Sequence, residues 1–434
     1  MADLLEISTR IIDEGVAHGP TNRITHELSE IHDKIAMVEA FSHSVLFRTD
    51  DGLVVFDTSG LQSGNRVVEA IRGWSNERFN SLVYTHGHID HVGGCGAFIA
   101  DVESRSDPTP EIIAHENVPK RFDRYNLTNG YNLEINRRQF RGFGTRGYGI
   151  GGEAGRFLPQ ETRKPNTTYC TNLEFSVAGL DVELHHARGE TDDHTWAWIP
   201  QHKAICAGDF FIWNFPNAGN PQKVQRYPRE WAAAMRDMAG RGAELFLPAH
   251  GLPITGEQRI RTVLTEVADT LDTLVNETLA LMNEGARLND IIHSVKVAPD
   301  LLEKPYLKPL YDEPEFVIRN VWRLYGGWYD GNPSQLKPAR DDQLASELAD
   351  LCGGARNLAE RAKELADADE LRLACHLIEL AVLAEPHSKD GHALRAEIYQ
   401  QRREGETSMM AKGIFGYASS ESLHLAGKED PFQK

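Results

Sequence analysis

The sequence lacks long apolar runs, an excess of basic charge and any regular spacing of cysteines. No apolar stretch in its 434 residues approaches the roughly 18 residues of a membrane-spanning helix. The net charge of −18 at pH 7 argues against binding to nucleic acid or anionic lipid, because phosphate recognition needs a basic surface. We therefore expect neither a membrane span nor a nucleic-acid partner.

Residues 1–8 show no basic segment followed by an apolar one, so we expect no secretion signal there. The five cysteines are odd in number and widely scattered, which argues against a disulfide framework. These observations predict a cytoplasmic protein whose cysteines are buried apolar thiols. The 41% apolar and 25% charged residues are typical of a globular protein, and the length allows two or three domains.

The pattern between residues 35 and 255 alternates between strands and helices. Strands are predicted at 37–47, 53–56, 82–85, 111–114, 180–185, 195–199, 204–206 and 245–248, with a helix at 65–74. This alternation predicts a layered α/β domain. The stretch from His115 to Cys170 is rich in Gly, Arg, Asn and Tyr and has little periodicity. We interpret residues 116–170 as a long insertion that lines the substrate entrance.

Beyond Gln258 the pattern becomes helical. A long helix is predicted at 261–284, and three more at 357–367, 370–383 and 390–401 resemble a tetratricopeptide unit. We therefore predict a catalytic domain at 1–297, a connecting arm at 298–344 and a helical domain at 345–434.

The motif that carries most of the chemistry is Thr-His-Gly-His-Ile-Asp-His at residues 85–91, directly after an apolar strand. Three imidazoles and a carboxylate are costly to place beside a core unless a cation binds them, and zinc and similar metals accept both kinds of ligand. His86 and His88 are spaced to reach one ion, and Asp90 and His91 to reach a second. The motif therefore predicts two metals, which need further ligands.

Three later residues meet this need. Glu190, Asp209 and His250 each follow a strand-like run, and each stands beside a glycine that lets the chain turn close to a site. We therefore expect all three to converge on the same end of the domain as the motif at 85–91.

The motif at 85–91 and the segments around Glu190, Asp209 and His250 resemble, in this order, four sequence elements of the metallo-β-lactamase superfamily of binuclear hydrolases. Those elements are His-x-His-x-Asp-His, Gly-His-Thr-Pro-Gly-His, Gly-Asp and Pro-Gly-His-Gly. Glu190 departs from the pattern, because a ligand histidine usually stands there, whereas Thr191 and His194 still match. Glutamate at this place resembles the alkylsulfatase branch of the superfamily. Residues 325–333 and 371–386 resemble, respectively, the segment that precedes the alkylsulfatase dimerisation domain and that domain's central helix.

The resemblance implies an αββα sandwich followed by a small all-helical, tetratricopeptide-like dimerisation domain. It also implies two Zn²⁺ ions, with Fe or Mn as substitutes, one held by His86, His88 and Glu190 and the other by Asp90, His91 and His250, with Asp209 as the bridge. The catalytic residues would be Asp90 and Asp209, with a metal-bridging hydroxide as the nucleophile. His194 is either the alternative ligand to Glu190 or a residue that orients a ligand.

The resemblance defines the substrate less well. Residues 210–228 lack the histidines that alkylsulfatases have there, and their aromatic side chains would form either a wall for an alkyl chain or part of the core. Candidates for binding the substrate or orienting a ligand are His194, His115, Tyr131 and Arg319. Arginine suits a sulfate because its guanidinium binds two anionic oxygens at once.

We therefore expect a binuclear zinc hydrolase that cleaves a small-molecule alkyl sulfate and forms a homodimer through its C-terminal helices. One alternative is a hydrolase of carboxylic esters, lactones or thioesters, because a scaffold alone does not fix the substrate. The other is a metal-stabilised scaffold protein without catalysis. The complete set of ligands argues against this second alternative.

Overall fold

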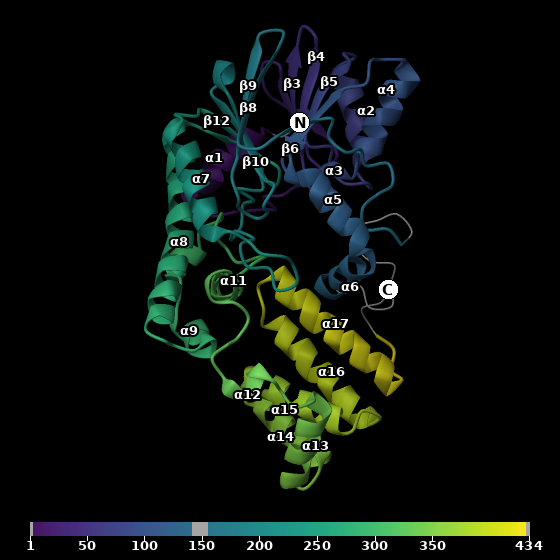
Figure 1. Cartoon of the computed structure of the whole chain (residues 1–434), viewed down its shortest axis with the longest axis vertical. Coiled ribbons are helices and arrows are strands. Elements are labelled where there is room, and N and C mark those ends of the chain that lie inside the picture. The colour runs from purple at the N-terminus through teal and green to yellow at the C-terminus, as the bar shows by residue number, and fades with distance from the viewer. Residues whose placement is uncertain (1–2, 141–154, 431–434) are drawn as a thin grey trace. The chain divides into compact units, whose positions relative to one another are not determined.

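The computed structural model describes residues 3–140 and 155–430 (Figure 1). The described chain separates into two compact units. The larger unit contains the described parts of residues 1–133, 149–286 and 290–327, and the smaller those of 134–148, 287–289 and 328–434. In the described residues, no helix combines the length and apolar character needed to cross a bilayer.

Two β-sheets form the centre of the larger unit. The first has the strand order β1-β2-β3-β4-β5-β6-β7 and the second β13-β12-β11-β10-β9-β8. The first sheet contains β1 (Leu28–His32), β2 (Ile35–Val38), β3 (Ser44–Thr49), β4 (Gly52–Phe56), β5 (Phe79–Val83), β6 (Glu111–His115) and β7 (Thr167–Tyr169). The second contains β8 (Asn172–Val177), β9 (Leu180–His186), β10 (Thr195–Ile199), β11 (Ala204–Gly208), β12 (Leu245–Pro248) and β13 (Ile254–Thr255).

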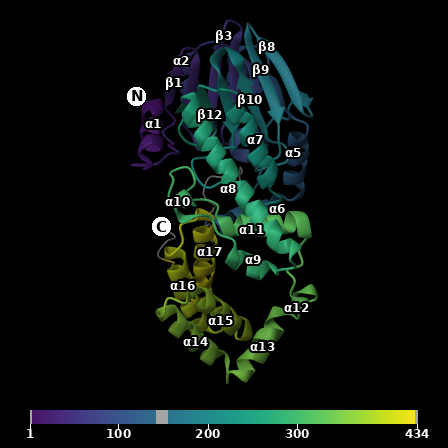
Figure 2. The same cartoon turned by 90° about the vertical axis from the view of Figure 1, so that its left-hand side faces the viewer.

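The two sheets bury their alternate side chains against each other. Met37, Phe47 and Val54 of the first sheet share a core cluster with Val182 and Leu184 of the second. The opposite side chains of the first sheet pack against α2 (Gly64–Trp74) and α4 (Cys95–Arg105). On the other side, α7 (Pro228–Gly240) and α8 (Glu257–Asn283) cover the second sheet (Figures 1 and 2). This order of layers confirms the predicted αββα sandwich.

Several elements of the larger unit differ from the predictions. The single strand predicted at 37–47 is wrong, because β2 ends at Val38 and β3 begins at Ser44. The segment after His115, which shows little periodicity in the sequence, contains two helices, α5 (Asn117–Leu127) and α6 (Asn129–Gln139). Residues 141–154 of the predicted insertion lie outside the described residues.

The smaller unit is helical in its C-terminal part, as predicted. Its helices are α12 (Pro333–Leu336), α13 (Asp341–Leu351), α14 (Ala355–Asp367), α15 (Leu371–Ala384), α16 (Lys389–Glu404) and α17 (Met409–Ala426). Leu358, Ala374 and Ile378 belong to its buried cluster, together with Ile398. The last helix, α17, has no counterpart in the prediction, and it buries mainly small residues such as Gly413 and Ser419.

The strands of the larger unit position the functional residues through the loops that follow them. The parallel strands β4, β5 and β6 of the first sheet end at one edge, and β11 and β12, which are parallel in the second sheet, end beside it. Short loops and the four-residue helix α3 (Ile89–Val92) begin at these strand ends. Polar side chains that directly follow the strands therefore meet at one place.

Candidate metal centre

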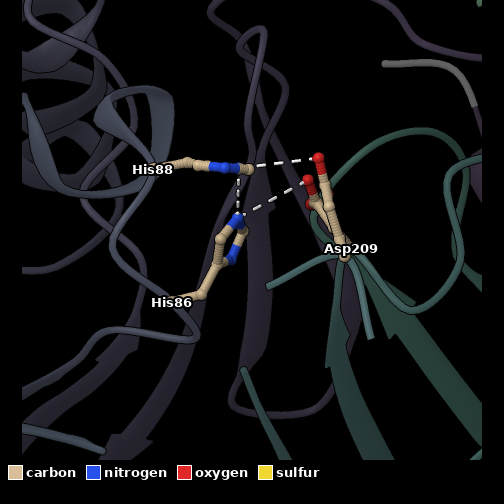
Figure 3. Close-up of side chains that lie close together, drawn as sticks. His86, His88 and Asp209 are labelled. Carbon is tan, nitrogen blue, oxygen red and sulfur yellow. Dashed lines mark hydrogen bonds and ion pairs between the residues drawn. The ribbon is translucent and has the colours of Figure 1, made fainter. Parts of the chain in front are cut away.

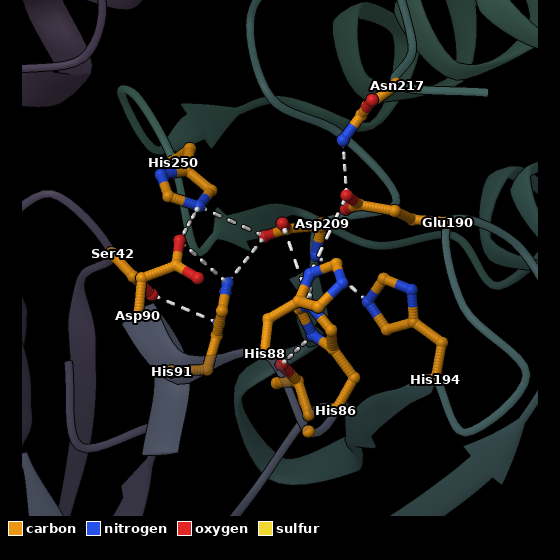
Figure 4. Close-up of polar contacts among 12 residues, drawn as sticks. Ser42, His86, His88, Asp90, His91, Glu190, His194, Asp209, Asn217 and His250 are labelled. Atoms are coloured by element: carbon orange, nitrogen blue, oxygen red, sulfur yellow. Dashed lines mark hydrogen bonds and ion pairs between the residues drawn. The ribbon is translucent and has the colours of Figure 1, made fainter. Parts of the chain in front are cut away.

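Seven histidine, aspartate and glutamate side chains meet at these strand ends. Four of them, His86, His88, Glu190 and Asp209, form one group, which we call the Glu190 group. Asp90, His91 and His250 form a second, which we call the His250 group. Within each group the candidate ligand atoms lie within 4.8 Å of one another. All seven are residues that the sequence motifs single out, and the structure brings them together as expected (Figure 4).

Asp209 faces both groups at once. Its Oδ2 lies 3.8 Å from Nε2 of His86 (Figure 3). Its Oδ1 lies 3.2 Å from Nε2 of His91 and 3.4 Å from Nε2 of His250. One carboxylate oxygen is thus directed to each group, which is the arrangement that a bridging carboxylate requires.

Several buried atoms of the cluster lack the partner that burial normally demands. Oε2 of Glu190 has no hydrogen-bond partner, and Oδ1 of Asp209 and Nε2 of His91, which lie 3.2 Å apart, make no contact with hydrogen-bond geometry, although such atoms are costly to bury unsatisfied. Nε2 of His86 also lies only 2.8 Å from Nδ1 of His88. A divalent cation would satisfy these atoms, because imidazole nitrogens and carboxylate oxygens are ligands of zinc and its neighbours. The residues therefore fit the metals that the motifs imply.

The two groups differ in charge. Burial opposes protonation of His250, but Asp209 and Asp90 outweigh it and raise its pKa to about 10. Burial also opposes protonation of His91, but Asp209 and Asp57 raise its pKa well above the usual value. In the metal-free protein these two histidines therefore carry the positive charge that the carboxylates need.

In the Glu190 group burial prevails. It lowers the pKa of His86 and His88 well below the usual value. It raises the pKa of Glu190, and the nearby carboxylate of Asp209 adds to this increase while Arg226 opposes it. Neutral histidines are ready to bind a metal without losing a proton.

A shell of polar groups orients the histidine ligands. Nδ1 of His91 lies 2.7 Å from Oδ2 of Asp57 and 3.0 Å from Oγ of Ser42. Nδ1 of His250 donates to the carbonyl of Phe41 at 2.5 Å. These bonds place the Nε2 atom of both histidines toward the cluster, as metal ligands require. The sequence motifs do not identify these supporting residues.

Glu190 is held by two side chains from the loop that follows β11. Nδ2 of Asn217 donates to Oε1 of Glu190. The buried Arg226 donates to the backbone carbonyl of Glu190, and its Nη2 lies 3.4 Å from Oε1. Arg226 therefore places a positive charge beside the Glu190 group.

His194 lies beside the cluster but outside both groups. Its Nε2 accepts a hydrogen bond from the backbone N–H of Asp209, and its ring stacks on Phe210. This bond brings the ring of His194 close to the backbone of Gly208. A Cβ at position 208 would lie 2.7 Å from Nε2 of His194, so only glycine leaves room for the ring. The geometry thus favours Glu190 as the ligand and His194 as the residue that orients Asp209.

The other candidates lie in different surroundings. His115 stacks on His186 with ring centroids 3.6 Å apart and donates from Nε2 to the carbonyl of Cys170. Tyr131 is 61% exposed, and the exposed Arg319 pairs with Glu315 at 3.3 Å. None of the three candidates belongs to either group. The aromatic side chains Phe210, Phe211, Trp213 and Phe215 are buried, so they form core instead of an open wall.

A two-sheet sandwich with such a cluster at the strand ends is the arrangement that the resemblance to the metallo-β-lactamase superfamily implies. Comparison with family models agrees: residues 38–250 match the metallo-beta-lactamase superfamily, and residues 287–424 match the alkyl sulfatase dimerisation family. The chain therefore carries a metallo-β-lactamase superfamily domain followed by an alkyl sulfatase dimerisation domain, as the resemblance predicted.

Curated alkylsulfatases are similar to this chain over most of its length. A linear primary-alkylsulfatase from a Pseudomonas species is 24% identical over 403 residues, which cover 88% of this chain and 74% of the relative. An (R)-specific secondary-alkylsulfatase from Pseudomonas is 26% identical over 395 residues, which cover 86% of this chain and 59% of the relative. The alkyl/aryl-sulfatase BDS1 of Saccharomyces cerevisiae is 24% identical, with 87% and 60% covered. The chain thus spans less than two thirds of the length of the last two relatives.

A solved structure supports the fold. The stereoselective inverting sec-alkylsulfatase Pisa1 from a Pseudomonas species matches 94% of this chain with a TM-score of 0.80 and 23% sequence identity. The match covers 66% of that protein.

Proposed function

We propose that this protein is a metal-dependent hydrolase that cleaves alkyl sulfates. The observation that carries the proposal is the position of Asp209 between two groups of candidate metal ligands, in a chain that also has an alkyl sulfatase dimerisation domain. The domain similarity supports the substrate class, and the cluster supports the chemistry.

Two cations would occupy the cluster. His86, His88 and Glu190 would hold one, Asp90, His91 and His250 the other, and Asp209 would contact both. Zinc suits this mixture of nitrogen and oxygen ligands, as do iron and manganese. Two such ions, when bound, lower the pKa of a shared water toward neutrality and stabilise negative charge on the oxygens of an ester.

The two catalytic carboxylates face the same histidine. Oδ2 of Asp90 and Oδ1 of Asp209 each lie 3.4 Å from Nε2 of His250. Asp209 would accept a hydrogen bond from the attacking water and so direct its lone pair toward the ester. Its own position is fixed by the bond from its backbone N–H to His194.

Positive side chains near the Glu190 group favour an anionic ester over a neutral one. Burial is the largest cause of the lowered pKa of His88, and the nearby charges of Arg226 and Arg121 lower this pKa further. Lys223 lies near enough to Asp90 and Glu190 for both to raise its pKa, but burial, aided by Arg226, lowers that pKa to about 7, so Lys223 adds only part of a positive charge at neutral pH. A sulfate monoester keeps a negative charge throughout hydrolysis, so this side of the cluster would bind its sulfate group.

The test combines metal analysis with a substrate panel. We expect about two metals per chain in the wild type and fewer in Asp209→Ala, with the exposed Asp300→Asn as the unchanged control. Among alkyl sulfates, phosphate esters, lactones and thioesters, the alkyl sulfates should release product fastest. If a lactone or thioester is hydrolysed while the alkyl sulfates are not, the protein is a hydrolase of another class and the sulfatase proposal is wrong. Bound metal without turnover of any substrate would favour a scaffold protein.

The proposal includes a homodimer in the cytoplasm. The alkyl sulfatase dimerisation match at 287–424 supports self-association, and the five cysteines, all free, fit a reducing compartment. Light scattering at micromolar concentration should give twice the mass of one chain, and a single-chain mass would refute the dimer. Cell fractionation tests the compartment.

A further inference from the structure

Asp312 is a buried carboxylate for which the proposed chemistry has no role. It lies between α10 (Pro299–Leu302) and α11 (Pro314–Gly326), and its side chain is fully buried. Oδ2 accepts hydrogen bonds from the backbone N–H groups of Gly219 at 2.6 Å and Asn220 at 3.0 Å. Oδ1 accepts from the N–H of Glu313 at 2.7 Å. Three backbone donors thus compensate for the burial of one carboxylate.

The loop that Asp312 holds leads directly to the candidate metal centre. Nδ2 of Asn220 donates to Oδ1 of Asn217 at 3.3 Å. Nδ2 of Asn217 in turn donates to Oε1 of Glu190 (Figure 4). All of these side chains are buried. A continuous path of hydrogen bonds therefore runs from Asp312 to a candidate metal ligand.

The backbone of this loop fits only while it stays close to α11. A Cβ at Gly219 would come within 2.4 Å of the backbone of Phe316, so the loop touches the first turn of the helix. Asn220 has a φ of 32°, a strained value for a residue with a side chain. Such a conformation persists only when surrounding contacts enforce it, and the two hydrogen bonds to Asp312 do so.

We infer that Asp312 is a positioning residue for Glu190, acting through Gly219, Asn220 and Asn217. It fixes the loop, the loop fixes the amide of Asn217, and the amide fixes the rotation of the Glu190 carboxylate. The consequence is selective: Asp312 sets the affinity of the Glu190 group for its metal and leaves the His250 group unaffected. This inference rests on the proposed metal binding and is independent of the substrate.

The main experiment titrates metal-free protein with zinc in competition with a chromophoric chelator. Asp312→Ala and Asn217→Ala should each weaken one of the two zinc sites by about 10- to 100-fold, the usual effect of losing an outer contact of a ligand. The double variant should be no weaker than Asn217→Ala alone, because both act on the same path. Asp312→Asn keeps one acceptor oxygen and should restore part of the affinity. Asp101→Asn, which breaks the distant pair with Arg72, should change neither site.

Gly219→Ala provides a second route to the same loop, since its Cβ would push the backbone away from Phe316. It should weaken the same zinc site as Asp312→Ala. Equal weakening of both sites, full additivity with Asn217→Ala, or unchanged affinity in Asp312→Ala and Gly219→Ala would each overturn the inference.

Hydrogen–deuterium exchange of the metal-free protein separates this inference from the proposed function. In Asp312→Ala and Asp312→Asn, backbone amides at 217–220 and 189–191 should exchange faster than in the wild type, whether or not metal binds. Unchanged exchange there would overturn the positioning role by itself. Failure of the wild type to bind two zinc ions would instead contradict the proposed metal centre.

Discussion

Nε2 of His194 accepts a hydrogen bond from the backbone N–H of Asp209 at 3.0 Å (Figure 4). Burial lowers the pKa of His194 to about 3, so the ring is neutral and carries its proton on Nδ1. This nitrogen is therefore already used to hold the backbone of Asp209. His194, the last histidine of the second element, would thus support the centre without supplying a ligand.

Glu190 and His194 should consequently respond differently to substitution by glutamine. Glu190→Gln keeps an oxygen for Asn217 but loses the negative charge, so metal content should fall from about two ions per chain to about one. His194→Gln keeps an acceptor for the N–H of Asp209, so metal content should stay at about two while kcat falls. Metal analysis with steady-state kinetics checks this. The reverse pattern would make His194 the ligand.

Metal uptake should release protons from the His250 group. The pKa of His250 is raised to about 10, so this histidine is protonated at pH 8 in the metal-free protein, and the pKa of His91 is raised in the same direction. Metal binding needs the neutral form of both, and we expect at least one proton to leave. Apparent affinity should therefore rise as the pH increases toward 10. Calorimetry in buffers of different ionisation enthalpy measures the protons. His250→Ala should release fewer, and no release at pH 8 would contradict the charge assignment.

Asp57 should affect metal binding although it is not a ligand. It accepts from Nδ1 of His91 and from the backbone N–H of Thr85. Asp57→Asn places an N–H₂ group against one of these donors, which should weaken metal binding in the His250 group by about 10- to 100-fold. Competition with a chelator measures the loss. Ser42→Ala, which removes the longer 3.0 Å contact, should have a smaller effect. An equal loss in both variants would show that Asp57 has no special role.

The seven clustered residues were predictable because their signals are local. Each lies just after an apolar strand, often beside a glycine, and the ends of such strands converge. The residues that orient them depend on contacts between distant segments. Asp312 and Gly219, for example, are 93 positions apart, and no local pattern links them.

Helices α6 and α17, which the sequence pattern does not predict, share a physical reason, namely the lack of an apolar stripe. Helix α6 contains only Tyr131, Leu133 and Ile135 as apolar residues, too few for a helical stripe. Helix α17 packs through glycine and serine, which hydrophobic periodicity does not detect. The aromatic segment after Asp209 is ambiguous for another reason, because a core and an apolar wall use the same residue types.

Trp213 tests the assignment of that segment to the core. It is fully buried, and its Nε1–H donates to the carbonyl of Leu252 at 2.7 Å. Trp213→Phe leaves this carbonyl unsatisfied and should lower the free energy of unfolding by about 1–3 kcal/mol. Urea denaturation measures the change, and the same substitution at Trp328, which is 70% exposed, should cost less than about 0.5 kcal/mol. Unchanged stability with an altered preference for alkyl-chain length would make Trp213 part of a substrate wall.

The buried pair of Arg121 and Asp193 supports the loop between His86 and His88. Nε of Arg121 lies 2.6 Å from Oδ2 of Asp193, which also accepts from the N–H of Gly87 at 3.1 Å. Arg121→Ala leaves a buried carboxylate without its partner and should lower the free energy of unfolding by about 3–5 kcal/mol at pH 7. Arg188→Ala removes a partly exposed pair with Glu230 and should cost at most about 1 kcal/mol.

The pH dependence of this loss gives a second, independent check. Burial raises the pKa of Asp193, but Arg121 outweighs it, so the pKa lies below the usual value and the pair stabilises the wild type at every pH above about 4. Without Arg121, burial is opposed only by weaker contacts such as those with Thr191 and the N–H of Gly87, so we expect the pKa of Asp193 to rise above its unfolded value. Protonation then relieves the unpaired charge, so the difference between variant and wild type should shrink as the pH falls from 8 to 5. Urea denaturation across this range measures it, and a difference that stays constant would mean that Asp193 remains compensated by another group.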